Sequence, residues 1–345
     1  MNKNYFFSLL LASFTFFLSG CGTAIDNLNA YQQDIIEKAE HMPSQKALAG
    51  EKFKVIVMNV EDKGFKVAKS ANLGPALTRM LESEIGRDQA IDILDRSVSD
   101  KFAQEIQLNE MSGADISENS LLELADFAVV GELKNASFTS RFVQVQYWTD
   151  KKGYTHVIPA HYIYTAEVSG QIKIYELPSM KIKKIISFSD NQRRSEDSKF
   201  LGRRAYVDNG LVNKAGENAI HSSRLEIKNF LAPKGYVIGA RSFDGKKILK
   251  ISLGSENGAK EGDSIDITTK KNVTDQLTEK TEVELYVIAH GTISNQIQKK
   301  SAWILVDDVS DGERVRLGDE AKIVYKKGFS DYMNDAGKLA NSFSK

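Results

Sequence analysis

Apolar residues between positions 51 and 232 alternate between strand-like runs and helix-like spacing. Val129 and Val130 lie within one such run, and β-branched residues favour strands. The runs predict five strands, at residues 54–60, 91–94, 127–138, 165–175 and 181–188. Apolar positions three or four residues apart predict helices at residues 73–85, 98–109, 120–125 and 211–231. This alternation predicts an α+β protein that begins with an α/β sandwich, in which helices pack against a mixed sheet.

From residue 233 the pattern changes to short apolar runs that follow glycine turns. Gly262-Asp263-Ser264 and Gly318-Asp319 each begin such a run. The expected strands are residues 248–253, 264–267, 283–288, 303–307 and 320–323. We therefore predict a boundary near Pro233, a small all-β barrel or sandwich domain at residues 233–327, and a flexible tail at 328–345.

The N-terminus has the pattern of a secretion signal. Lys3 precedes an apolar stretch at residues 5–17, which is shorter than the roughly 20 residues of a membrane-spanning helix. We predict a signal peptide at residues 1–20. Residues 22–50 are mostly polar, so we expect a tether at 21–50 ahead of the α/β domain at 51–232.

Composition narrows the function. The chain has 345 residues, with 46 basic and 46 acidic side chains and one cysteine. The balance of charge argues against a whole-protein contact with nucleic acid. A single cysteine excludes a disulfide within the chain and a cysteine-rich zinc module. The informative feature of this cysteine is therefore where it stands in the sequence.

Four residues at the end of the signal, Leu18, Ser19, Gly20 and Cys21, resemble the lipobox of bacterial lipoproteins. The resemblance implies that Cys21 receives diacylglycerol and an N-acyl chain, a covalent lipid and not a cofactor. Acidic residues after the cysteine retain such lipoproteins in the inner membrane. Gly22 stands there, which implies an outer-membrane anchor with the body in the periplasm. The alternative is an ordinary signal peptide with an incidental cysteine.

The order of elements at residues 53–232 resembles the curli-secretion lipoprotein family (CsgG-like). The family's strand after Ala-Asp carries a V/I-x-G pattern, matched by Ala125, Asp126, Val130 and Gly131. Residues 168–188 resemble its later hairpin. The C-terminal part resembles the β domain of flagellar-assembly periplasmic proteins. The first resemblance implies a lipoprotein of secretion or surface assembly, and its pore-forming members insert two hairpins per subunit.

Residues 142–148 and 157–164 predict one such hairpin, which turns at 150–153. The second would fall at residues 189–210, where clustered charges oppose insertion into lipid. We therefore favour a periplasmic body that binds partners or a second copy of itself. The candidate partner or oligomer surface combines aromatic and basic residues: Phe142, Tyr147, Trp148, Arg193, Arg194, Arg203 and Arg204.

Catalytic and metal-binding patterns are weak. Gly262-Asp263-Ser264 resembles the GDS nucleophile of lipases, but its late position favours a turn into a strand. His156 and His161 lie five residues apart, and we expect exposed polar histidines there and no metal site. We find no phosphate-binding loop, zinc-protease or nucleophile-elbow motif. We predict that the protein is not an enzyme.

Together these patterns predict an outer-membrane lipoprotein that faces the periplasm. Its predicted role is a non-catalytic scaffold or assembly and export factor for a surface structure, such as a curli-like fibre, a flagellum or a polysaccharide. One alternative is an oligomeric secretion pore of the CsgG type. Another is an activator of a peptidoglycan synthase, for which the 30-residue tether would reach about 100 Å.

Overall fold

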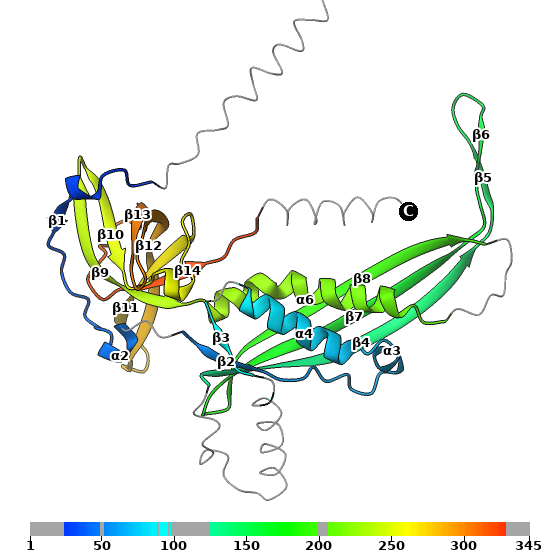
Figure 1. Ribbon diagram of the computed structural model, residues 1–345, viewed down its shortest axis with the longest axis horizontal. Helices are drawn as coiled ribbons and strands as arrows, with labels where there is room; N and C mark the ends of the chain where they lie inside the picture. The colour runs from blue at the N-terminus through cyan, green and yellow to red at the C-terminus, as the bar shows by residue number, and fades with distance from the viewer. Residues whose placement is uncertain are drawn as a thin grey trace, which may run out of the picture. The chain divides into compact units, whose positions relative to one another are not determined.

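The computed structural model describes residues 24–48, 52–87, 90–95, 97, 125–198 and 206–328 (Figure 1). The chain forms two compact units. One comprises Met1–Glu51 and Lys234–Val324, and we call it the barrel unit. The other comprises Lys52–Pro233 and Tyr325–Lys345, and we call it the α/β unit. The units meet in sequence between Pro233 and Lys234, where the glycine-turn pattern begins.

The α/β unit is built on a five-stranded sheet with the order β3-β2-β4-β7-β8. β2 runs parallel to both β3 and β4, whereas β4, β7 and β8 are antiparallel, so the sheet is mixed. The strands are β2 (Lys54–Val57), β3 (Asp92–Ile93), β4 (Phe127–Val143), β7 (His161–Glu176) and β8 (Lys181–Asp197). A separate two-stranded hairpin consists of β5 (Gln146–Thr149) and β6 (Thr155–Ile158).

Helices cover one face of this sheet. They are α3 (Lys66–Ser70), α4 (Leu73–Gly86) and α6 (Asn209–Leu231), with α4 and α6 side by side (Figure 1). The Asp208 side chain caps α6 by accepting a hydrogen bond from the Leu211 amide at 3.0 Å. Gly216 lets the two helices approach, because a Cβ there would lie 2.7 Å from Leu73 Cδ1. The predicted apolar stripe of α4 is buried in the core that these helices share with β4 and β7.

The barrel unit closes a six-stranded sheet on itself, because β14 pairs with β9 as well as with β11. The order around the barrel is β9-β10-β13-β12-β11-β14. Its strands are β9 (Lys234–Phe243), β10 (Lys246–Ile251), β11 (Ser264–Thr274), β12 (Thr281–Ile297), β13 (Ala302–Val309) and β14 (Glu320–Val324). A single 3-10 turn, η4 (Ser255–Asn257), follows β10. The prediction of an α+β protein is confirmed, and the β domain is a barrel.

The predicted tether at residues 21–50 needs a correction, because residues 25–48 pack on the barrel. Ile25 is 2% exposed and clusters with Ile248 and Trp303. The segment forms η1 (Leu28–Ala30), β1 (Gln32–Asp34) and α2 (Gln45–Leu48), and β1 pairs with β9. Isolated apolar residues in a polar stretch therefore find distant partners on the barrel wall.

In the α/β sheet, β4 and β8 run well past their predicted ends, as β11 and β12 do in the barrel. β4 continues to Val143, and β8 continues through the polar residues 189–197. The backbone of β7 pairs with β8 from Glu176 to His161, so main-chain hydrogen bonds hold a segment whose side chains gave no strand pattern. Residues 189–210, where the second hairpin of the curli-secretion family would fall, therefore begin as the end of the edge strand β8.

Several predictions lie outside the described residues. They are the signal peptide, the lipobox Leu18, Ser19, Gly20 and Cys21, the helices at 98–109 and 120–124, Arg203 and Arg204, and the tail after residue 328. Within the described residues, no helix combines the length and apolar character needed to cross a membrane.

Candidate functional site

The hairpin formed by β5 and β6 projects from the end of the α/β sheet (Figure 1). β4 and β7 pair up to Val143 and His161, and the ladder then breaks on both sides. Pro159 lies in the break between β6 and β7, where it has no N–H to donate to a ladder. The residue pattern predicted continuous strands at 142–148 and 157–164. That expectation was wrong, although Pro159 was a visible signal of the break.

The hairpin turn is organised by Asp150. Its Oδ1 accepts hydrogen bonds from the Lys152 amide at 2.9 Å and the Tyr154 amide at 3.0 Å. His156 Nε2 lies 3.1 Å from Asp150 Oδ2. The hydrogen bond from His156, followed by that from the Tyr154 amide, lowers the pKa of the Asp150 carboxyl. These contacts fix the turn although every residue of β5 and β6 is exposed.

Large apolar side chains of this hairpin are exposed. Tyr147 is 67% exposed and Trp148 is 52% exposed. Their neighbours Val145, Tyr154, Val157 and Ile158 are exposed as well. The Trp148 ring stacks on the His156 ring with centroids 4.4 Å apart. An isolated two-stranded hairpin is marginally stable in water, so a surface of this kind favours burial against a partner.

Aromatic rings continue from the base of the hairpin along the helix-covered face of the sheet. Phe142 contacts Tyr162 with ring centroids 5.0 Å apart. Tyr162 stacks on Tyr164, and Tyr164 stacks on Phe138, each at 6.0 Å. Tyr162 and Tyr164 are buried, so this part of the predicted aromatic surface packs the sheet. The exposed part of the site is the hairpin itself.

Arg193 and Arg194, the basic residues of the predicted surface that the structure describes, do not lie on one face. Arg193 pairs in register with Thr165 and Arg194 with Tyr164, so their side chains lie on opposite faces of the sheet. Arg194 stacks over the Tyr164 ring at 5.5 Å and forms an ion pair with Asp208 at 3.2 Å. Arg194 thus fastens β8 to the start of α6. The Arg194 side chain is still 55% exposed, so its assignment to the partner surface stays a prediction.

The pore interpretation requires longer strands than the hairpin has. β5 and β6 each contain four residues, whereas a membrane-spanning β-strand needs about 9–11. β4 carries three exposed polar residues just before the break, Thr139, Ser140 and Arg141. The projecting hairpin is therefore better suited to contact a protein surface than to cross the hydrocarbon layer.

A second group of charges lies on the sheet face opposite the helices. Glu132 Oε1 is 2.7 Å from Lys134 Nζ, and Oε2 is 2.9 Å from Lys173 Nζ. Lys63 Nζ approaches Oε1 at 3.3 Å, and the Glu132 side chain is only 10% exposed. The hydrogen bonds from Lys134 and Lys173 hold the pKa of the Glu132 carboxyl well below its ordinary value. The cluster is internally satisfied, so it stabilises the sheet.

We expect Glu132→Gln to lower the free energy of unfolding by about 1–2 kcal/mol at pH 7, because three partly exposed lysines lose their shared anion. The lowered pKa means that the carboxylate stabilises the fold above its unfolded pKa of about 4.3 and less as the pH falls below it. Urea unfolding at several pH values measures this. The difference should shrink in acid, and Glu61→Gln, whose carboxyl is 57% exposed, is the matched control. Equal effects of the two changes would contradict the assignment.

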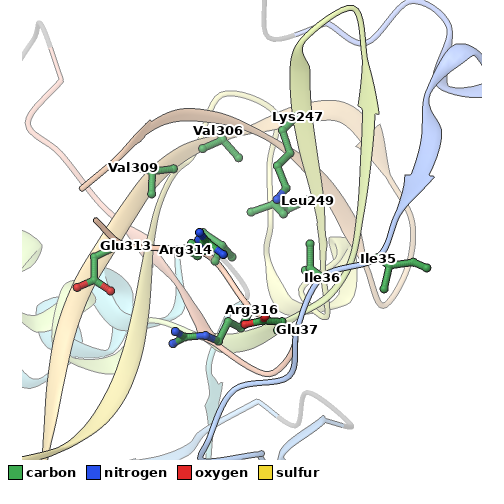
Figure 2. Close-up of a pocket in the computed structure, with 11 residues that line it drawn as sticks. Ile35, Ile36, Glu37, Lys247, Leu249, Val306, Val309, Glu313, Arg314 and Arg316 are labelled. Atoms are coloured by element: carbon green, nitrogen blue, oxygen red, sulfur yellow. The ribbon is translucent and has the colours of Figure 1, made fainter. Parts of the chain in front are cut away.

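The barrel unit contains a cavity of about 450 Å³ (Figure 2). Its wall includes Ile36, Leu249 and Val306, and charged side chains surround it. The charged residues are Glu37, Lys247, Glu313, Arg314 and Arg316. No described residue of the lining is a serine, histidine or cysteine, so the cavity offers none of these nucleophiles.

The remaining sequence candidates lie apart. Gly262-Asp263 forms a turn into β11, in which Asp263 Oδ2 accepts the Lys260 amide at 2.9 Å. His161 Nδ1 lies 2.8 Å from the Pro159 carbonyl, and His156 contacts Asp150. Over the described ranges, no three His, Cys, Asp or Glu side chains gather where they could hold a metal ion.

Comparison with known proteins gives little beyond this geometry. No family model matches the chain, and no curated protein matches it. A PelC variant dodecamer from Paraburkholderia phytofirmans is 8% identical with a TM-score of 0.23, over 55% of this chain and 95% of that chain. A minor lipoprotein from Acinetobacter baumannii is 9% identical with a TM-score of 0.23, over 52% and 91%. Neither is described as a curli-secretion protein, and TM-scores this low carry no functional argument.

Proposed function

We propose that the protein is an outer-membrane lipoprotein whose periplasmic body acts without catalysis as a scaffold or assembly factor for a surface structure. The observation that supports this most is the β5–β6 hairpin, which presents Tyr147 and Trp148 to solvent. Exposed aromatic residues on a projecting element are typical of partner-binding surfaces. The partners in this proposal are secretion or surface-assembly proteins, together with further copies of the chain.

The anchor in this proposal is a lipid on Cys21, as the lipobox-like sequence Leu18-Ser19-Gly20-Cys21 implies. Two or more acyl chains hold a protein on a bilayer stably. Ile25 is already buried in the barrel unit, and four residues span at most about 14 Å. The anchor would therefore keep the barrel unit close to the membrane surface.

This short reach weakens one alternative. An activator of a peptidoglycan synthase needs a tether that crosses part of the periplasm, and residues 25–48 pack on the barrel. The pore alternative needs spanning strands, and the β5–β6 hairpin has four residues in each. A scaffold near the outer membrane needs neither a long tether nor membrane-spanning strands.

The proposal predicts that Tyr147→Ser with Trp148→Ser abolishes assembly or export of the surface structure in a strain that carries only this copy. Because both side chains are exposed, the variant should remain folded and membrane-anchored. Electron microscopy, motility and polysaccharide staining measure the surface structures. Membrane fractionation and the melting temperature of the purified chain show that the variant is intact.

The matched control is Lys151→Ser with Lys152→Ser, which changes exposed charges at the tip of the same hairpin and leaves its aromatic residues in place. We expect normal surface structures with this control. Unchanged surface structures in the Tyr147 and Trp148 variant would contradict the assignment of the hairpin as a partner-binding site.

A further inference from the structure

A second hairpin extends beyond the wall of the barrel. β11 and β12 pair from Ser264 and Thr292 as far as Thr274 and Thr281. β13 covers β12 only from Ala289 onward, and the Ser310 amide donates to the Ile288 carbonyl at 2.8 Å. In the part of the chain that the structure describes, no strand pairs with the outer edge of residues 281–287. We call this segment the free edge of β12.

The free edge has an apolar face and a polar face. Val283, Leu285 and Val287 alternate along one face and are 53%, 59% and 46% exposed. The other face carries Glu282, Glu284 and Tyr286. An exposed strand edge with apolar side chains offers unpaired backbone groups to another strand.

We infer that the free edge of β12 pairs antiparallel with the free edge of a second copy of this chain. In an antiparallel pair, residues directly opposite each other point to the same face of the sheet. Two copies of one strand related by a two-fold axis normal to the sheet meet this condition only if one residue lies opposite its own copy, so the pairing must centre on a residue. With Leu285 at the centre, Val283 lies opposite Val287 of the copy and Leu285 lies opposite itself. Glu284 then lies opposite Tyr286, and these two residues already form a hydrogen bond within the chain.

Charge excludes the neighbouring registers. A centre at Val283 places Glu282 opposite Glu284, and a centre at Glu284 places that carboxylate opposite itself. Like charges directly opposite each other destabilise a strand pair. A centre at Tyr286 leaves only residues 285–287 to pair, because the Ser310 amide already binds the Ile288 carbonyl and Val309 pairs with Ala289. Leu285 is therefore the centre that satisfies both the charges and the free length of the strand.

The pairing is isologous, so it closes as a dimer in which each copy contributes the free edge of its β12. The inference goes beyond the proposed function, because it concerns the barrel unit and requires neither the β5–β6 hairpin nor a surface structure. If the chain is anchored by Cys21, confinement to a membrane raises its effective concentration and favours the pair.

Disulfide trapping tests the register in the purified chain that carries Cys21→Ser, because Cys21 is the single native cysteine. Opposed residues of antiparallel strands have Cα atoms about 4.5–5.5 Å apart, within the range of about 4.4–6.8 Å for a disulfide. Leu285→Cys should therefore form a disulfide-linked dimer under mild oxidation. A mixture of Val283→Cys and Val287→Cys chains should cross-link between the two variants.

Two controls make the test specific. Val283→Cys alone should not cross-link, because the two copies of residue 283 would lie about 13 Å apart along the strands. Leu277→Cys, at a 93% exposed position in the β11–β12 turn, should not cross-link either. Sedimentation of the chain without added cysteines should show a concentration-dependent dimer, which Leu285→Lys reduces.

Cross-linking of Val283→Cys alone as fast as Leu285→Cys would overturn the register. A chain that sediments as a monomer at every soluble concentration would overturn self-pairing. This result would hold equally if the free edge of β12 bound only an extended peptide of another protein. Either result leaves the outcome of the Tyr147 and Trp148 experiment unchanged, so the two proposals fail separately.

Discussion

A Cys21→Ser chain is expected to lose all palmitate labelling and to move from the membrane fraction to the soluble periplasm. Each buried CH₂ of an acyl chain contributes about 0.8 kcal/mol to membrane binding. Serine has no thiol to receive diacylglycerol, so this contribution is lost completely. No helix among the described residues is long and apolar enough to cross the membrane in place of the lipid anchor. Metabolic labelling followed by fractionation measures the change.

Gly22→Asp is the matched control for the anchor. The lipoprotein resemblance implies that an acidic residue at this position retains the lipid-bearing chain in the inner membrane. The control should therefore keep its palmitate label and shift between membranes in a density gradient. Membrane fractionation of Cys21→Ser identical to that of the unchanged chain would refute the lipid anchor.

Leu77→Ala is expected to lower the free energy of unfolding of the α/β unit by about 2–5 kcal/mol. Leu77 is fully buried in the core between α4, α6 and the sheet. Its Cδ2 lies 2.9 Å from the place where a Cβ on Gly216 would stand, so α6 packs closely over it. The truncated side chain would leave a cavity in a close-packed region. Urea unfolding followed by the helical circular dichroism signal measures the loss, because α4 and α6 belong to this unit.

Leu277→Ala makes the same chemical change at a 93% exposed position. We expect an effect within about 0.5 kcal/mol, as for most surface substitutions. A loss of stability at Leu277 equal to that at Leu77 would contradict the assignment of the core. The comparison also separates residues that hold the fold from exposed residues, such as Trp148, that we assign to partner binding.

The spacing of apolar residues predicted those helices and strands whose own residues show a helical or strand pattern. The helical spacing of Leu73, Leu77, Leu81 and Ile85 appears in α4, and all four are buried. The glycine turns after residue 233 predicted the β unit. Closure of the barrel could not be derived from such patterns, because it depends on the pairing of β14 with β9, in which Glu320 lies opposite Tyr236 and Lys322 lies opposite Lys234.

Long-range contacts explain the errors. Ile25 is an isolated apolar residue in a polar stretch, and its partners Ile248 and Trp303 are far away in sequence. The polar end of β8 is a strand because β7 supplies backbone partners. At the candidate site, Tyr147 and Trp148 were identified from their aromatic character. The ion pair between Arg194 and Asp208 is another contact that the local sequence could not reveal.

We propose that the exposed aromatic residues of the β5–β6 hairpin contact an assembly partner in the periplasm. Site-specific photocross-linking in intact cells tests it most directly, with the photoreactive residue at Tyr147 and, as the control, at Tyr206, which is 83% exposed elsewhere in the α/β unit. We expect adducts between position 147 and a secretion or surface-assembly protein, and none of these at position 206. Adducts at position 147 with membrane lipid alone, or the same adducts at both positions, would contradict it.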